Sequence, residues 1–313
     1  MIPTKNEVLE AYERVRPFVH QTPVLTSSHI DFLMGAKVYF KCENFQKMGA
    51  FKMRGAINAI LQLTEEQKKA GVVTHSSGNF AQALSLAARN LGVKAYIVMP
   101  ENAPNVKKEA VKGYGGIVTE SEATAISREN EAERIQTETG ATFIHPSNDN
   151  NVILGNSTSA YELLRSHPDL DCIIAPVGGG GLLAGTALSV RYFGQNCRAV
   201  GAEPFEVDDA FRSLQSGKIE NNASTSTIAD GLKTFLGDLN FPIIKELVSE
   251  IIRVEENEIV TAMRTIWERM KIIVEPSSAV ALAALLREKK QFSEKKVGII
   301  LSGGNVDLKN LPF

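Results

Sequence analysis

Four consecutive glycines, Gly178 to Gly181, stand between an apolar run and a helix-like segment. Without side chains, several backbone N–H groups can approach one anion closely, and the start of the following helix adds a partial positive charge. One or two glycines would suit a tight packing turn, whereas four in a row favour a phosphate ligand. No Lys-Ser or Lys-Thr pair follows them, which argues against a Walker-type nucleotide loop.

The same glycines also fit a second kind of site. Gly179, Gly181 and Ala184 satisfy the G-x-G-x-x-A spacing of a dinucleotide-binding turn. Glu203 ends the next apolar run, where a ribose-binding acid belongs. On this spacing alone the chain would be an NAD-dependent dehydrogenase, although such turns usually open their domain and more than half of this chain precedes the glycines.

A lysine near the N-terminus points to different chemistry. Lys52 follows Phe51 and is flanked by small and apolar residues at the predicted start of a helix. Burial beside such groups lowers the pKa of an amine. A neutral lysine amine can attack a carbonyl carbon and form a Schiff base.

Short apolar strands alternate with amphipathic helices along the chain, which predicts an α/β fold with parallel sheets. Residues 213–227 are polar and are predicted to be irregular. The predicted strands are 38–42, 72–74, 95–99, 117–119, 173–176, 199–203 and 297–301, and the predicted helices are 55–69, 81–91, 106–114, 127–139, 153–164, 182–192, 256–270 and 277–288.

The unusual residues lie in the turns that follow predicted strands. These turns are Ser76 to Asn79, Gly178 to Gly181 and Ser302 to Asn305. Ligands of open parallel sheets collect at the carboxyl ends of the strands. We therefore expect distant parts of the chain to build one cleft.

Composition excludes several classes of partner. A formal net charge of -2 over 313 residues gives no electrostatic reason to bind nucleic acid or a membrane surface. The three cysteines, Cys42, Cys172 and Cys197, are an odd number without metal spacing, which is typical of thiols in a reducing cytosol. With no apolar leader or membrane-length run, the chain is expected to be cytoplasmic.

Taken together, five segments resemble the serine racemase and threonine dehydratase family of pyridoxal phosphate (PLP) enzymes. They are Phe51 to Ala56, Ser76 to Asn79, Gly178 to Leu182, Met270 to Pro276 and Ser302 to Asn305. The resemblance covers nearly the whole chain. It implies the two-domain tryptophan synthase β-like fold (fold type II), with a parallel-sheet-rich large domain at 1–68 and 147–313 and a smaller open α/β domain at 69–146.

The resemblance also implies roles for individual residues. Lys52, next to Phe51, would bind PLP covalently and act as the base on one face of the substrate Cα, and Ser77 would face the other side. Asn79 would meet the ring hydroxyl of the cofactor, Gly178, Gly179, Gly180 and Gly181 its phosphate, and Ser302 its pyridine nitrogen. Ser76, Ser77, Asn79 and Arg134 would bind the substrate.

Four further positions bear on a metal or on the substrate. Glu203, the Val207 carbonyl and Asp209 match the positions that bind Mg or Ca in eukaryotic members, and hard cations take such oxygen ligands. Phe80 replaces the histidine that usually follows the asparagine in this family, which leaves the substrate open.

The expected activity is a PLP-dependent ammonia-lyase (dehydratase) that converts L-serine or L-threonine to a 2-oxo acid, with or without serine racemase activity. The alternatives are a dedicated serine racemase, a 3-hydroxyaspartate dehydratase, the NAD-dependent dehydrogenase and a PLP-carrying protein without turnover. A homodimer is expected.

Overall fold

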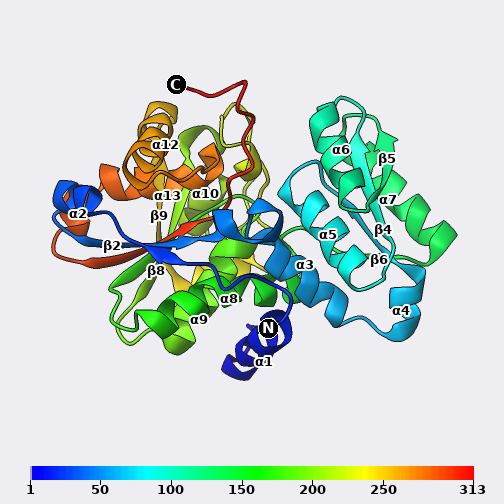
Figure 1. Ribbon diagram of the computed structural model, residues 1–313, viewed down its shortest axis with the longest axis horizontal. Helices are drawn as coiled ribbons and strands as arrows, with labels where there is room; N and C mark the ends of the chain where they lie inside the picture. The colour runs from blue at the N-terminus through cyan, green and yellow to red at the C-terminus, as the bar shows by residue number, and fades with distance from the viewer. Residues whose placement is uncertain (1) are drawn as a thin grey trace.

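The computed structural model describes residues 2–313 and contains two separate sheets, each flanked by helices (Figure 1). The larger sheet has the strand order β1-β2-β10-β7-β8-β9, and only β1 runs antiparallel to its neighbour. Its strands are β1 (Val24–Leu25), β2 (Lys37–Cys42), β7 (Cys172–Pro176), β8 (Arg198–Pro204), β9 (Val248–Val254) and β10 (Lys296–Leu301). This confirms the predicted parallel-sheet α/β fold.

The smaller sheet is wholly parallel, in the order β5-β4-β3-β6, and lies inside the segment 69–146. Its strands are β3 (Val72–His75), β4 (Ala95–Pro100), β5 (Ile117–Ser121) and β6 (Thr142–Phe143). Parallel strands need crossover connections, and helices supply them here. The helices of this part are α4 (Glu65–Ala70), α5 (Asn79–Asn90), α6 (Asn105–Gly113) and α7 (Ala125–Thr139).

Helices cover both faces of the larger sheet, so its central strands are buried on both sides. One core forms against α12 and α13, and the other against α8 and α9, on the opposite face (Figure 1). The helices are α1 (Lys5–Val15), α2 (Ser28–Met34), α3 (Lys52–Leu61), α8 (Asn150–Ser166), α9 (Gly181–Phe193), α10 (Asp209–Ser216), α11 (Phe241–Leu247), α12 (Glu256–Met270), α13 (Pro276–Arg287) and α14 (Lys289–Phe292).

Helix α3 joins the two parts. It packs against α8 beneath the larger sheet and against α5 beside the smaller one. Its apolar residues, including Met53, Ile57 and Ile60, share a core with α5, β3 and β4. The helix therefore lies where both parts of the molecule meet, and it carries Lys52 at its first position.

The structure corrects three sequence expectations. The single helix predicted at 55–69 is two helices, because Thr64 and Gln67 form a capping box that starts α4 afresh. The segment predicted as irregular at 213–227 begins inside α10, and only the part after Ser216 lacks helix and strand. Strand β9 was not predicted, because its sequence VSEIIRV mixes polar and apolar residues.

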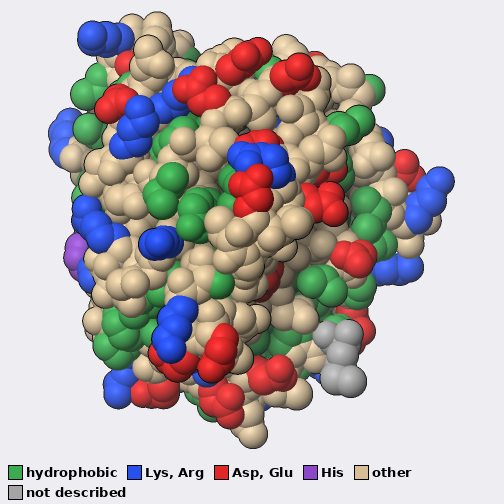
Figure 2. Space-filling view, turned by 90° about the vertical axis from the view of Figure 1, so that its right-hand side faces the viewer, with side chains coloured by type: hydrophobic (Ala, Val, Ile, Leu, Met, Phe, Trp, Pro, Cys, Tyr) green, Lys and Arg blue, Asp and Glu red, His purple; other side chains and the backbone are tan. Residues whose placement is uncertain are grey.

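None of the helices within residues 2–313 is both long and apolar enough to cross a membrane. Figure 2 views the molecule from the side of the smaller sheet, where basic and acidic side chains are interspersed.

Candidate active site

A cleft of about 1470 Å³ lies between the two sheets, and the three predicted turns line it together. Phe51 and Lys52, Ser76 to Asn79, Gly178 to Gly181 and Ser302 all contribute to its wall. Since these turns follow β2, β3, β7 and β10, the site gathers at the carboxyl ends of parallel strands.

Lys52 presents to this cleft an amine whose pKa is well below the ordinary value. Its Nζ donates to the Pro146 carbonyl oxygen at 2.6 Å and lies 5.1 Å from the ring centroid of Phe51 and 5.6 Å from that of Phe80. Burial lowers the pKa of Lys52 to about 8, against the opposing charge of Glu275. A substantial fraction of the amine is therefore nucleophilic near neutral pH.

The glycine turn offers an unsatisfied anion-binding surface. Gly178 to Gly181 are buried residues, and none of their backbone N–H groups donates to a hydrogen-bond acceptor within residues 2–313. Buried N–H groups are nearly always paired, so this set calls for an anion at the start of α9. The residues present therefore fit a phosphate group.

Close packing also requires glycine in this turn. A Cβ on Gly178 would lie 2.9 Å from the Gly231 carbonyl oxygen, and one on Gly181 would lie 2.9 Å from the Ser147 carbonyl oxygen. Asn240 supports the turn by donating from Nδ2 to the Gly179 carbonyl oxygen at 2.9 Å. Packing and ligand binding thus both explain the glycines, and the sequence carried no signal for the support from Asn240.

Asn79, at the first position of α5, connects the two sides of the cleft. Its Nδ2 donates to both carboxylate oxygens of Glu275, at 2.9 and 3.1 Å, and its Oδ1 accepts from Asn305 at 2.9 Å. Burial raises the pKa of Glu275 to about 7. Glu275 was not among the predicted site residues, because its partner lies 196 positions away in the chain.

The three serines of the predicted site all line the cleft. Ser302 is buried at the end of β10, and its carbonyl oxygen accepts from the Phe51 N–H at 3.0 Å. Ser76 and Ser77 are half-buried in the turn after β3, where Ser76 Oγ accepts from the Gly78 N–H.

Arg134 does not reach this cleft, and its expected substrate contact is not supported. It lies on the outer side of α7, where it pairs with Glu131 at 2.6 Å and Glu138 at 2.5 Å. Arg128, six residues earlier on the same helix, lines the cleft instead. Its charge helps burial to lower the pKa of His75, and no ion pair joins Arg128 to a carboxylate of residues 2–313.

The predicted metal ligands lie outside the cleft, at the end of β8. Glu203 accepts from the Ala210 and Phe211 N–H groups, and Asp209 accepts from Asn222 and the Leu236 N–H. Both carboxylates are buried. Burial and the charge of Asp209 raise the pKa of Glu203, and burial raises that of Asp209 to about 6.

Neither of these two carboxylates forms an ion pair with a basic side chain of residues 2–313. Within residues 2–313 no group of three or more His, Cys, Asp or Glu side chains is arranged to hold a metal. A cation here would have to use the two carboxylates, the Val207 carbonyl oxygen and water. The oxygen donors fit a hard divalent cation.

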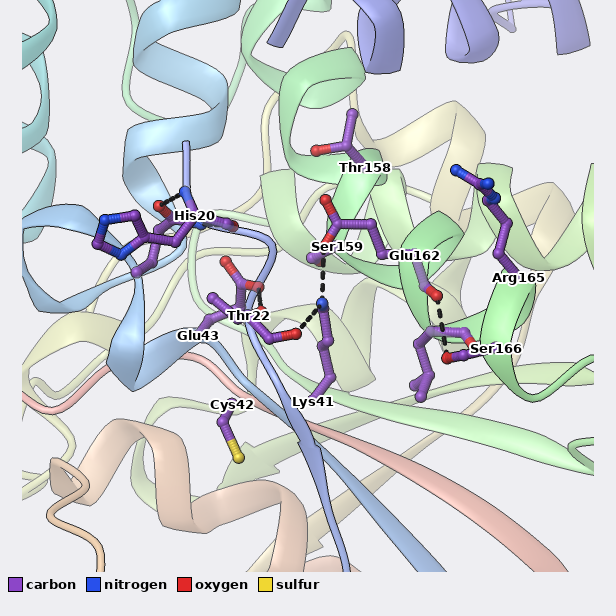
Figure 3. A network of polar contacts seen from close by, with 12 residues as sticks. His20, Thr22, Lys41, Cys42, Glu43, Thr158, Ser159, Glu162, Arg165 and Ser166 are labelled. Atoms are coloured by element: carbon purple, nitrogen blue, oxygen red, sulfur yellow. Dashed lines mark hydrogen bonds and ion pairs between the residues drawn. The ribbon is translucent and has the colours of Figure 1, made fainter. Parts of the chain in front are cut away.

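A buried ionic network holds α3 through Arg54, and Figure 3 shows its members Lys41, Glu43 and Glu162. Arg54 is bidentate to Glu43, at 2.7 and 2.9 Å, and to Glu162, at 2.8 Å for both contacts. Lys41 donates to Glu162 at 2.6 Å and to the Thr22 carbonyl oxygen at 2.8 Å. Burial alone would raise the pKa of Glu43, but the Arg54 guanidinium holds it below its usual range.

The fold and the cleft define a class of enzyme that binds an anionic aldehyde on a lysine. The pyridoxal-phosphate dependent enzyme family matches residues 15–303 of this chain, and the chain belongs to that family. Family membership resolves the choice between PLP and NAD in favour of PLP.

Individual relatives are similar to this chain over nearly their whole length. The beta-hydroxyaspartate dehydratase of Paracoccus denitrificans is 46% identical over 100% of this chain and 99% of its own length. The crystal structure of serine racemase from Dictyostelium discoideum is 50% identical, with a TM-score of 0.94 over 98% of this chain and 100% of that one. The crystal structure of maize serine racemase is 48% identical, with a TM-score of 0.96 over 99% of this chain and 95% of that one.

Proposed function

We propose that this protein is an ammonia-lyase that dehydrates L-serine or L-threonine to a 2-oxo acid, and that it also racemises serine. The observation that carries the proposal is the meeting, in one cleft, of the Lys52 amine and four unpaired amide N–H groups of the glycine turn. An aldehyde with a phosphate tail satisfies both features. The relatives with serine racemase and dehydratase activity support a small hydroxy-amino acid as substrate.

When bound, pyridoxal phosphate supplies an electron sink that stabilises negative charge at the substrate Cα. Lys52 then takes the Cα proton on one face of the substrate, and Ser77 lies on the other. Asn79 would hold the ring hydroxyl, Ser302 the pyridine nitrogen and Phe51 the face of the ring. Because a serine hydroxyl does not hold that nitrogen as a pyridinium, loss of the β-hydroxyl is favoured over transamination.

The test is an assay of the purified protein. We expect a visible absorption band that borohydride abolishes, and formation of 2-oxo acid, ammonia and D-isomer from L-serine. Ser77→Ala should suppress the D-isomer and retain part of the 2-oxo acid. A colourless protein that does not turn over hydroxy-amino acids would contradict the proposal, and a coloured one without turnover would favour a PLP-carrying binding protein.

One observation favours 3-hydroxyaspartate as a second substrate. Arg128 lines the cleft without a carboxylate partner among residues 2–313, and a second substrate carboxylate would supply that partner. A charge-assisted hydrogen bond contributes about 1.5–3 kcal/mol. The beta-hydroxyaspartate dehydratase relative supports this specificity.

Replacing Arg128 with methionine should therefore separate the two substrates. We expect kcat/KM for 3-hydroxyaspartate to fall about 10- to 100-fold, while the value for L-serine changes little. Steady-state kinetics on both substrates measure this, and Arg134→Met is the matched control because that side chain faces away from the cleft. Equal losses on both substrates would remove Arg128 from this role.

We further propose a Mg or Ca site at Glu203, Asp209 and the Val207 carbonyl oxygen. A cation would compensate two buried carboxylates that form no ion pair with a basic side chain of residues 2–313. At 100 times its dissociation constant, a ligand that binds only the folded state adds about 2.7 kcal/mol of stability.

Adding CaCl₂ or MgCl₂ to metal-free protein should accordingly raise its melting temperature by several degrees. Asp209→Asn should abolish the shift, whereas Glu206→Gln, an exposed neighbour, should preserve it. Differential scanning fluorimetry reads both variants. A shift that survives Asp209→Asn would place the cation elsewhere.

The remaining expectations concern assembly and location. We infer a homodimer from apolar side chains exposed on α2, where Phe32 is 86% and Leu33 40% exposed, and analytical ultracentrifugation tests it.

All three cysteines are free, which supports the proposal that the protein is located in the reducing cytoplasm. Residues 69–146 are proposed to close as a small domain over the substrate.

A further inference from the structure

A histidine that the proposed mechanism does not use lies at the wall of the cleft. His145 follows β6 and directly precedes Pro146, whose carbonyl oxygen accepts from Lys52. It lines the cleft and is half-buried there. Its ring meets that of His75 edge to face, with 6.2 Å between centroids.

Hydrogen bonds fix the protonation of the His145 ring. Nδ1 accepts from two backbone N–H groups, those of Ser147 at 3.1 Å and Asn148 at 2.8 Å. A nitrogen that accepts two N–H donors cannot carry a proton of its own, because that proton would point at the donors. The ring is therefore neutral, and its proton is on Nε2.

The charges around the ring favour the same state. Lys52 and His75 both oppose a positive charge on His145, and Asp238 is the only acidic group among residues 2–313 that counteracts them. With burial as the largest cause, the pKa of His145 falls to about 4. The imidazole thus stays neutral over the whole range in which the enzyme is expected to work.

The Nε2–H is left available to the cleft. The Nδ1 edge of the ring faces its own loop, so the opposite edge is the one the ring can present to the cavity that it lines. Nε2 has no hydrogen-bond partner within residues 2–313. Arg128 and His75 also line this cavity, and the charge of Arg128 helps to lower the pKa of His75.

We propose that His145 is a fixed neutral hydrogen-bond donor whose Nε2–H binds the oxygen on the Cβ of the substrate. This inference rests on the proposed function and assigns His145 as a specificity and leaving-group residue of the same site. When the Cβ–O bond breaks with its electron pair on oxygen, the donor stabilises the negative charge that develops there without transferring its own proton, and the proton that Lys52 took from Cα completes the departing water. A donor already oriented before the reaction needs no reorganisation when that charge develops.

Two substitutions distinguish the role of Nδ1, which accepts from the loop, from the role of Nε2, which donates to the cleft. In His145→Asn, the side-chain oxygen can still accept from the loop N–H groups in place of Nδ1, but the cleft-facing donor is lost. In His145→Gln, the longer amide can place a donor near the Nε2 position, but the loop acceptor is lost. His167→Asn, at the C-terminal end of α8 and outside the cleft lining, is the control.

We expect His145→Asn to keep its melting temperature and its cofactor band and to lose about 100-fold in kcat on L-serine. His145→Gln should recover much of kcat at a lower melting temperature. Unchanged kcat in an intact, coloured His145→Asn variant would overturn the inference. If the wild-type protein is inactive on all hydroxy-amino acids, the proposed function fails instead.

The tautomer itself can be read without turnover. In protein labelled with ¹⁵N-histidine, His145 is assigned by comparison with the His145→Asn variant. Its nitrogen shifts should report a protonated Nε2 and an unprotonated Nδ1 between about pH 5 and 8. A proton on Nδ1, or a ring that becomes charged near about pH 6.5, would also overturn the inference.

Discussion

Replacing Lys52 with alanine should abolish covalent cofactor attachment and lower kcat by about 10³-fold or more, because one side chain provides both the nucleophile and the Cα base. The visible band and the borohydride-sensitive product should disappear together. Absorbance spectroscopy and the 2-oxo acid assay measure the two losses. The glycine turn should still bind free PLP weakly, since its N–H groups are untouched.

Matched variants distinguish the loss of covalent attachment from the loss of the positive charge of Lys52. Lys52→Arg keeps a cation between Phe51 and Phe80 but cannot form the covalent bond, so it should be as inactive as the alanine variant. Lys47→Ala removes a lysine from the preceding turn and should retain activity. Turnover and bound colour in Lys52→Ala would contradict the assigned role.

The lowered pKa of Lys52 also predicts how cofactor uptake depends on pH. Only the neutral amine attacks the aldehyde, and its pKa is about 8 rather than the ordinary value of 10.5. The rate of covalent attachment to the apoenzyme should therefore rise with pH up to about 8 and then level off. Stopped-flow absorbance after addition of PLP follows this rate.

Local patterns were sufficient to predict which turns line the cleft. The glycine turn and Lys52 were recognisable because each depends on a few adjacent residues and on the strand or helix beside them. The alternation of strands and helices likewise predicted the parallel sheets and the shared cleft. Elements with weak patterns, such as the two-residue strands β1 and β6, could not be predicted in this way.

The sequence of helix α7 contains a signal that distinguishes Arg128 from Arg134. Ala132 and Ile135 are its buried residues, and Arg128 lies four and seven positions before them, on the same face. Arg134 is adjacent to Ile135, about 100° around the helix. The buried face of α7 consists of only two residues, yet it predicts that Arg128 faces the cleft and that Arg134 faces solvent.

Other site residues depend on contacts that no local pattern contains. Glu275 precedes α13 as an ordinary acidic residue before a proline, and its role becomes visible only through Asn79. His145 likewise gains its fixed tautomer from the backbone of its own turn and its cleft position from the packing of two sheets. Such residues can be identified as site residues only from the tertiary structure.

The second large effect concerns the buried ionic network beneath α3. Arg54→Met would leave Glu43 and Glu162 buried with only Lys41 to compensate two negative charges. Removing one partner of a buried ion pair costs about 3–5 kcal/mol. We expect the free energy of unfolding in urea to fall by about this amount, whereas Lys112→Met in an exposed pair should have little effect.

A charge-balanced double variant tests whether pairing is the cause. Arg54→Met combined with Glu162→Gln leaves Lys41 and Glu43 as equal opposite charges, so the double variant should be more stable than the sum of the two single losses predicts. Because Arg54 lies two residues after Lys52, the single variant should also attach PLP more slowly even where it remains folded. Additive losses in the double variant, with normal attachment in Arg54→Met, would show that the network stabilises the fold without positioning the lysine.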